Sequence, residues 1–332
     1  MALISVIIPV YNEESFIVEC LHSVYSQDYP IEEIEIIIVD GNSSDKTVDI
    51  IREKFPEVIL LHNSRKIVPV SMNIGIKKAT GDYIIRLDAH CKYPVNYLSR
   101  LVQAIQYYGA DNVGAICRTL PANNTKKAQA IAIALSSRFG MGNSSFRVGV
   151  DKVKEVDTVP FGCFPRTLFE RIGFYDEELI RNQDDELNGR IIKNGGKIIL
   201  LPDLIVDYYG RDSIKKVYKM FYQYGLFKPL GNQKLGKAMS VRQFVPLLFS
   251  FGLILGGLIS FFSIIFFNIY LFVILFYLLV DILSSVMYAK SVKVCLYLFI
   301  LFPIIHFIYG WGYIHGIVKI LSHSSFSAKI NR

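Results

Sequence analysis

The sequence predicts a layered α/β domain followed by a membrane region of helices. Two observations carry this prediction. Short apolar runs alternate with helical stretches over residues 4–88, and the run from Phe244 to Val280 contains no charged side chain. Strands that are separated by helices pair in parallel and form a sheet that helices cover on both faces. An uncharged run about twice the ~20 residues needed to cross a bilayer indicates two membrane helices.

The first half of the α/β part is expected to be Rossmann-like, because strands and helices alternate regularly. The expected strands are Ile4–Pro9, Ile34–Asp40, Val58–His62 and Tyr83–Asp88, and the expected helices are Glu14–Ser26, Lys46–Lys54 and Val68–Ala79. After the second strand, Ser44 or Asp45 is the expected N-cap of the next helix. That turn contains neither GxGxxG nor GxxxxGK[ST], which argues against a dinucleotide site and a P-loop.

The pattern is looser after residue 92. We expect helices at Pro94–Tyr108 and Asp184–Asn194, a small-residue helical patch at Gln129–Ser137, and strands at Asn112–Thr119 and Val156–Phe161. The glycine-rich segment around Arg147 is predicted to be a mobile loop over a site.

The membrane region is expected over residues 241–320 as three helices, at 244–262, 265–288 and 294–318. The first two are predicted to form a hairpin that folds back near Phe267 and Asn268. Pro303, Gly310 and Gly312 leave open whether the third segment crosses fully or is kinked or re-entrant.

The distribution of charge predicts the orientation in the membrane. Of the net charge of +7, residues from Val241 onward carry +5, which leaves only +2 for residues 1–240. The positive-inside rule puts the flanking lysines and arginine in the cytoplasm (Lys228, Lys234, Lys237, Arg242, Lys290 and Lys293). A complete third crossing would leave Lys319, Lys329 and Arg332 outside, against the rule.

Several classes of protein are disfavoured. Leu3–Val10 is too short for the apolar core of a signal peptide, so the soluble domain is expected in the cytosol, attached to the cell membrane by a multi-pass region. The soluble part has no basic stripe with interleaved aromatic residues, which argues against a nucleic-acid partner. The five cysteines form no CxxC pair, so neither a zinc site nor a disulfide framework is expected.

Two clusters of ionisable residues are candidates for chemistry. Asp88 and His90 lie two residues apart at the end of an apolar run, and side chains with this spacing point the same way from a strand. They could hold one divalent ion at the carboxyl edge of the sheet, where α/β folds bind ligands, although an acid there also closes turns. Asp184 and Asp185 begin a helix, where carboxylates are also favoured by the helix dipole.

Four segments together resemble family 2 glycosyltransferases with a GT-A fold. They are residues 7–14 (IIPVYNEE), 39–47 (VDGNSSDKT), 88–90 (DAH) and 183–190 (QDDELNGR), in the family's order. Residues 86–94 and 162–166 and the C-terminal membrane helices are most similar to bacterial exopolysaccharide glycosyltransferases of the succinoglycan type. The resemblance implies a GT-A nucleotide-sugar transferase domain over residues 1–230.

The resemblance also implies how the donor is bound. Pro9, Tyr11 and Glu13 would surround the nucleobase and ribose, and Asp40 would receive the base edge of a uridine or similar nucleotide. Asp88 and His90 replace the family's Asp-x-Asp pair and would hold Mg²⁺ or Mn²⁺ on the diphosphate. Imidazole suits Mn²⁺ better than Mg²⁺, so the preferred metal is left open.

The family's Glu-Asp motif implies the catalytic base. Counting back from Leu187 assigns the base to Asp184 and puts Gln183 where the family has Glu, while Asp185 is the rival if the register slips by one. Losing the neighbouring acid would lower the pKa of the base relative to a paired-acid site. Arg190 completes the motif and is predicted to bind the nucleotide sugar.

Residues 222–228 loosely resemble the Gln-x-x-Arg-Trp motif of processive synthases. On that reading Gln223 and Lys228 would close over the diphosphate or the acceptor. The alternative is an amphipathic interfacial helix over about residues 213–228, with tyrosines and lysines at the lipid headgroups. The two interpretations are compatible.

The predicted function is a membrane-anchored inverting glycosyltransferase that moves a sugar from a nucleotide-diphosphate donor, expected to be a UDP-sugar, to a lipid-linked saccharide in polysaccharide biosynthesis. One rival is a polyprenyl-phosphate sugar synthase. The basic residues before the membrane would favour it, because they could bind the acceptor phosphate (Arg211, Lys215, Lys216 and Lys219). Another is a non-catalytic sugar-binding assembly subunit, suggested by Gln183 and His90.

Overall fold

The computed structural model describes residues 1–238 and 240–327. The chain divides into two compact units. The first combines residues 1–118 with 149–208, and the second combines residues 119–148 with the described chain from Tyr209 onward. Lys329 and Arg332, which the charge argument used, lie outside the described residues.

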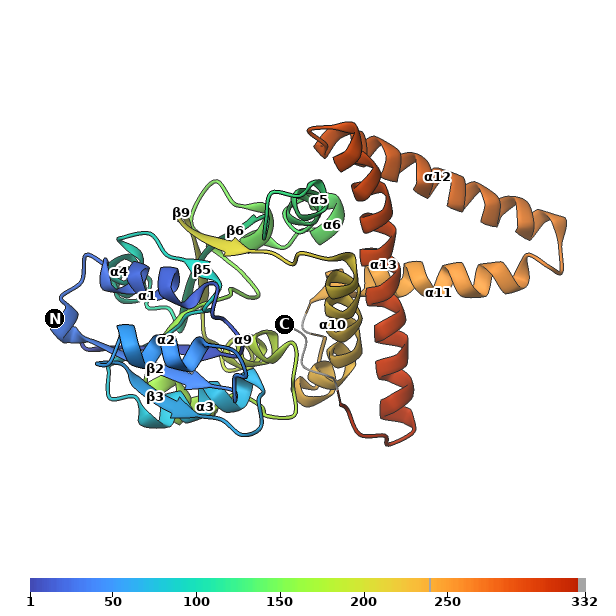
Figure 1. Cartoon of the computed structure of the whole chain (residues 1–332). Coiled ribbons are helices and arrows are strands. Elements are labelled where there is room, and N and C mark those ends of the chain that lie inside the picture. Colours follow the sequence, from blue (N-terminus) through green and yellow to red (C-terminus); the bar gives the residue numbers. More distant parts are fainter. Residues whose placement is uncertain (239, 328–332) are drawn as a thin grey trace. The chain divides into compact units, whose positions relative to one another are not determined.

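The first unit is built on a parallel half-sheet, as the sequence predicts (Figure 1). Strands β1 (Ile4–Val10), β2 (Ile34–Asp40), β3 (Ile59–His62) and β4 (Tyr83–Arg86) are all parallel, in the order β3-β2-β1-β4. Every residue of β1 is buried, because helices cover both faces of this central strand.

Helices α1 (Ile17–Tyr25), α2 (Thr47–Lys54) and α3 (Val68–Lys78) connect these strands. The predicted N-cap at Ser44 or Asp45 is wrong, because Lys46 is the residue before α2 and no side chain caps the helix. The Asp45 carboxylate instead accepts hydrogen bonds from the backbone N–H and the hydroxyl of Thr47, the first residue of α2. Helix α4 (Tyr97–Tyr108) ends at Gly109, whose positive φ of 57° closes the helix in the left-handed region.

The other half of the sheet is antiparallel. It continues from β4 through β8 (Cys163–Pro165), β6 (Asn112–Leu120) and β9 (Ile198–Tyr209) to β5 (Cys91–Lys92), and β7 (Lys154–Glu155) also pairs with β9. Helices α8 (Thr167–Ile172) and α9 (Gln183–Lys193) follow β8 and precede β9, respectively. This mixed sheet with helices on a parallel half confirms the predicted fold class.

Two predictions about this half are wrong. The expected strand at Val156–Phe161 is a loop between β7 and β8, because Pro160 cannot donate to a ladder and Phe161 has a positive φ of 51°. The long strand β9 was not predicted. The strand contains Pro202, and proline within a run argues against a central strand. Buried and less buried residues nevertheless alternate over Leu204–Tyr209, as in an ordinary strand.

The second unit has a core shared by three helices. Residues of α5 (Lys126–Ala134), α10 (Ile214–Leu235) and α13 (Val292–Leu321) pack together in one buried cluster. Helix α10 is longer than the predicted interfacial segment and begins at the Ser213 cap. Short helices α6 (Arg138–Met141) and α7 (Ser145–Val148) follow α5.

Glycines let α10 and α13 approach closely. A Cβ at Gly225 would lie 2.0 Å from the Tyr309 carbonyl oxygen, and one at Gly312 would lie 2.3 Å from the Tyr222 carbonyl oxygen. Both distances are shorter than any real Cβ contact, so only glycine fits while the two backbones touch.

Within the described residues, three helices are long and apolar enough to cross a membrane: α11 (Phe244–Ile259) with the turn before it, α12 (Ile264–Tyr288) and α13. The fold-back predicted near Phe267 and Asn268 is wrong, because both residues lie inside α12. The turn occurs earlier, and the Ser263 hydroxyl caps α12. Helix α13 is one unbroken helix despite Pro303, and in Figure 1 it crosses the open end of the α11–α12 hairpin.

Candidate active site

The loops after β1 and β2 are joined by hydrogen bonds at the carboxyl edge of the sheet. The Asn12 backbone N–H donates to the Ser43 hydroxyl (2.9 Å), and the Asn12 side-chain oxygen accepts from the Ser44 N–H (2.8 Å). The Glu13 N–H donates to the Thr47 hydroxyl (2.8 Å). These contacts fix the backbone on both sides of Glu13 and therefore fix where its carboxylate points.

The residues predicted to surround the nucleobase lie along this edge. Pro9 is buried within β1, Tyr11 follows the strand, and the Lys66 ammonium group lies 5.9 Å from the centre of the Tyr11 ring. The Asp40 carboxylate accepts backbone hydrogen bonds from Asn42 (3.0 Å) and Ser43 (3.2 Å). Asp40 thus shapes the loop, and its contact with a base stays a prediction.

Glu13, Asp88 and His90 form a cluster of possible metal ligands. One ligand atom from each residue lies within 4.8 Å of the others. His90 Nδ1 is 3.1 Å from Asp88 Oδ1 and 3.2 Å from Glu13 Oε1. The side chains are largely buried, with exposed fractions of 5% for Glu13, 8% for His90 and 14% for Asp88. Two carboxylates and an imidazole are a donor set that suits a first-row divalent ion.

The position of His90 supports this interpretation. Its Nε2 atom is buried and has no hydrogen-bond partner among the described residues. The ring packs edge-on against Tyr208, with the ring centres 5.0 Å apart. The Tyr93 hydroxyl accepts from the Asp88 backbone N–H (2.7 Å) and fixes the turn that carries both ligands. The Nδ1 atom, on the other side of the ring, faces both carboxylates at the spacing of ligands that share one cation, so the three residues present fit a bound cation.

The predicted base, Asp184, lies in the first turn of α9 and binds Arg86. Arg86 is the last residue of β4, and its guanidinium donates to an oxygen of the Asp184 carboxylate. The Arg86 side chain is 7% exposed, whereas that of Asp184 is 30% exposed. The buried cation therefore holds a carboxylate that still reaches solvent.

The surroundings shift the pKa of both partners. Burial raises the pKa of the Asp184 carboxyl above its ordinary value, and the charge and hydrogen bond of Arg86 oppose that rise only in part. Burial alone would lower the pKa of Arg86, but Asp184, Tyr175 and Asp88 together raise it, so Arg86 stays charged. A carboxylate with a raised pKa is more basic once ionised, as a general base requires.

The neighbours of Asp184 differ in their contacts. Gln183 is buried, and its amide nitrogen lies 3.5 Å from Asp184 Oδ2. Asp185 is partly exposed in the same turn. Arg190, predicted to bind the nucleotide sugar, uses its guanidinium on Glu186 (2.6 and 2.9 Å) and on three backbone carbonyls of residues 172–174. These contacts tie α9 to residues 172–174, and binding of the nucleotide sugar by Arg190 stays a prediction.

Gln223 and Lys228 belong to the second unit, whereas the residues described above belong to the first. Both belong to α10 in the second unit and are buried there, with exposed fractions of 6% and 7%. Their predicted contact with the diphosphate or acceptor stays a prediction.

Sequence reasoning missed two features of the site. It did not place Glu13 beside His90, and the predicted contact of Glu13 with the nucleobase and ribose stays a prediction. It gave Arg86 no role, although Arg86 links the turn of Asp88 to the candidate base. A signal for Arg86 was available, because a cation inside the apolar run Tyr83–Leu87 needs a buried partner.

The chain is similar to known proteins over much of its length. Residues 5–173 match the model of glycosyl transferase family 2. The chain is 29% identical to a dolichyl N-acetyl-α-D-glucosaminyl phosphate 3-β-D-2,3-diacetamido-2,3-dideoxy-β-D-glucuronosyltransferase of Methanococcus voltae, over 96% of this chain and 98% of that protein. It is 30% identical to the succinoglycan biosynthesis protein ExoA of Rhizobium meliloti, over 73% of this chain and 74% of that protein.

The fold is also similar to that of a solved structure. Residues 1–349 of S. aureus TarS, crystallised with UDP-GlcNAc, match with a TM-score of 0.51 at 20% identity, over 70% of each chain. The chain therefore belongs to glycosyl transferase family 2, as its motifs predict. It is a glycosyltransferase with a GT-A-like domain and C-terminal apolar helices.

Proposed function

We propose that this glycosyltransferase moves a sugar from a UDP-sugar to a lipid-linked saccharide at the cytoplasmic surface of a membrane, with inversion of the anomeric centre. The observation that carries the proposal is the link between Arg86 and Asp184, because it joins the candidate base to the turn that bears Asp88. Similarity to a glucuronosyltransferase named for a dolichyl N-acetyl-α-D-glucosaminyl phosphate, and to a succinoglycan biosynthesis protein, supports the acceptor class.

Asp184 is the proposed general base. It would accept the proton of the acceptor hydroxyl as the hydroxyl oxygen forms a bond to the anomeric carbon. The bond from that carbon to the diphosphate breaks in the same displacement, so a single base suffices and the configuration inverts. Arg86 orients the carboxylate. The Arg86 guanidinium is already fixed in place by its contact with Asp184. Little energy is therefore needed to reorganise the site during the reaction.

Glu13, Asp88 and His90 would hold the divalent ion. When bound, the ion would stabilise the negative charge that develops on the leaving diphosphate. The imidazole favours Mn²⁺ over Mg²⁺. We expect His90→Ala to weaken Mn²⁺ binding, measured by electron paramagnetic resonance of the protein without substrate, by at least about tenfold. His62→Ala, which alters an exposed histidine at the end of β3, is the matched control. Equal Mn²⁺ affinity in wild type and His90→Ala would remove His90 from the metal site.

The packing of α13 supports a topology with two crossings. Helix α13 packs along α5 and α10, and α10 carries Lys215, Lys216 and Lys219 in its first turns. If α13 crossed the bilayer, α10 would be buried beside it and these lysines would lie in the hydrocarbon core. The free-energy cost would be several kcal/mol for each charge. We therefore propose that only α11 and α12 cross and that α13 lies at the cytoplasmic surface with α10.

This topology agrees with the positive-inside rule, because Lys319 then stays on the cytoplasmic side with Arg242. A reporter that fluoresces only in the cytoplasm, fused after Arg332, should be bright. A dark reporter, together with activity of a periplasmic reporter at the same position, would establish a third crossing.

The function is tested with detergent-purified protein, a panel of UDP- and GDP-sugars, Mn²⁺ or Mg²⁺ and a membrane-lipid extract. We expect lipid-dependent release of nucleoside diphosphate that Asp184→Asn abolishes and Asp185→Asn largely retains. A product that carries an extended saccharide would support the proposed acceptor, whereas a single sugar on a polyprenyl phosphate would support the synthase alternative. Donor binding without release, equal in wild type and Asp184→Asn, would support the non-catalytic binding subunit.

A further inference from the structure

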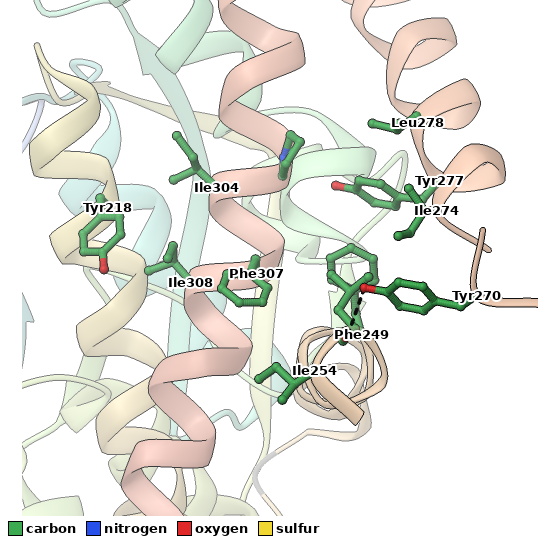
Figure 2. Close-up of a pocket in the computed structure, with 12 residues that line it drawn as sticks. Tyr218, Phe249, Ile254, Tyr270, Ile274, Tyr277, Leu278, Ile304, Phe307 and Ile308 are labelled. Atoms are coloured by element: carbon green, nitrogen blue, oxygen red, sulfur yellow. Dashed lines mark hydrogen bonds between the residues drawn. The ribbon is translucent and has the colours of Figure 1, made fainter. Parts of the chain in front are cut away.

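A cavity of about 620 Å³ lies among α11, α12 and α13 within the second unit (Figure 2). Its wall consists of aliphatic and aromatic side chains, including Phe249, Ile304 and Phe307, and one wall residue, Tyr218, comes from α10. The volume is within the roughly 300–1,000 Å³ typical of ligand pockets. A wall of this composition, contributed in part by the proposed membrane-spanning helices α11 and α12, fits a hydrocarbon chain.

Two tyrosines of α12 keep this cavity open. The Tyr270 hydroxyl donates to the carbonyl oxygen of Leu253 on α11 (3.1 Å, the dashed line in Figure 2). The Tyr270 ring packs on Gly256, where a Cβ would lie only 2.9 Å from the ring. Two turns later, the Tyr277 hydroxyl bonds to His306 Nδ1 on α13 (2.9 Å). Collapse of the cavity would break both hydrogen bonds in a low-dielectric medium.

His306 is itself fixed from the other side. Its Nε2 atom donates to the backbone carbonyl oxygen of Phe139 in α6 (2.7 Å). Because that partner can only accept, Nε2 carries the proton, and Nδ1 accepts from Tyr277. One chain of hydrogen bonds therefore ties α12, α13 and α6 together around the cavity. The hydroxyl groups of Tyr270 and Tyr277, which line the cavity, therefore both have hydrogen-bond partners.

Positive charge lies beside one side of the cavity. Lys215 and Lys219 are exposed on α10, and Lys215 lies three residues before Tyr218 and four before Lys219, so Lys215 neighbours both residues on that face of the helix. Neither lysine forms an ion pair with any residue in the described part of the chain. A phosphate group would be attracted to this face while an attached chain enters the apolar cavity.

We propose that the cavity binds the isoprenoid chain of the lipid-linked acceptor, with the acceptor phosphate at Lys215 and Lys219. This inference rests on the proposed function. The aromatic side chains of the wall favour an isoprenoid, because its planar double bonds and branched methyl groups offer flat, regularly spaced surfaces for ring contact. A saturated phospholipid tail offers neither and is the competing occupant.

The experiment compares two acceptors with the same phosphate-linked saccharide, one on a long polyprenyl chain and one on a short, water-soluble prenyl chain. Ile254→Trp and Ile304→Trp would fill the cavity from α11 and from α13. The matched controls are Leu258→Trp and Ile300→Trp, one turn away on the same helices and outside the cavity wall, at positions that are 57% and 49% exposed.

We expect the cavity variants to raise KM for the long-chain acceptor by about tenfold or more, the usual scale for lost apolar pocket contacts. KM for the short-chain acceptor should stay within about twofold, and the controls should change neither value. Equal effects on both acceptors, or no effect, would overturn the cavity assignment. Tyr270→Phe, which removes one support without adding bulk, should shift the long-chain KM in the same direction.

Failure of the proposed function would look different, because wild type would transfer sugar to neither acceptor. The inference would then be decided by binding. Polyprenyl phosphate retained by wild-type protein in phospholipid nanodiscs, and lost in Ile254→Trp and Ile304→Trp but not in the controls, would support the site. Retention of phospholipid alone, with no displacement by polyprenyl phosphate, would assign the cavity to ordinary membrane lipid.

Discussion

Removing the charge of Arg86 is predicted to raise the pKa of the candidate base. Arg86 donates directly to the Asp184 carboxylate and opposes the rise in pKa that burial causes. In Arg86→Gln this opposition is lost. The carboxyl then takes up its proton at a higher pH, so activity on the acid side disappears earlier as the pH falls.

The magnitude follows from the geometry of the pair. Two unit charges at about 4 Å interact by about 4 kcal/mol at an effective dielectric constant of about 20. The Asp184 side chain is 30% exposed, so solvent screens part of this energy, and we retain roughly half, or about 2 kcal/mol. At 1.36 kcal/mol per unit, the pKa of Asp184 should rise by about 1 to 2 units.

The assay is the pH profile of kcat/KM for sugar transfer, which reports ionisations of the free enzyme. Arg86→Gln should move the acid limb upward by about 1 to 2 pH units, and Arg86→Lys, which keeps the charge, should move it by less. Breaking a buried ion pair also costs about 3 to 5 kcal/mol of stability, so thermal unfolding and UDP binding must show that the variants are folded. An acid limb that stays in place in folded Arg86→Gln would refute the assignment of Asp184 as the titrating base.

Three further perturbations test separate parts of the structure. Gln183→Glu puts a like charge in place of the amide nitrogen 3.5 Å from Asp184 Oδ2, so the upper apparent pKa of the pair, and with it the acid limb of kcat/KM, should rise. Tyr93→Phe removes the Tyr93 hydroxyl that accepts from the part-buried Asp88 N–H, and chemical denaturation should show a loss of about 1 to 3 kcal/mol together with weaker Mn²⁺ binding. Gly312→Ala forces a methyl group against the Tyr222 carbonyl oxygen and should lower the thermal unfolding temperature in detergent, an overpacking cost of about 1 to 3 kcal/mol. Unchanged unfolding of Gly312→Ala would show that α10 and α13 are not in contact at this position.

The sequence predicted the elements that local pattern controls. The parallel strands β1 to β4 and the helices between them were found within a few residues, because their apolar periodicity is regular and each connection is short. Strand Val156–Phe161 failed because a positive φ at Phe161 depends on packing that no local pattern records. Strand β9 was missed because its partners β5, β6 and β7 lie far away in the chain.

By itself, the sequence determined the family, the GT-A-like class and the candidate residues Asp88, His90 and Asp184. The order of the motifs and the chemistry of their side chains can be read from the sequence alone. Only the tertiary structure decided that Arg86 binds a carboxylate 98 residues away and that Glu13 joins His90 across 77 residues. It likewise decided that α13 packs along α10. These are contacts between surfaces distant in the chain, and they form only when the sheet and the helices bring those surfaces together.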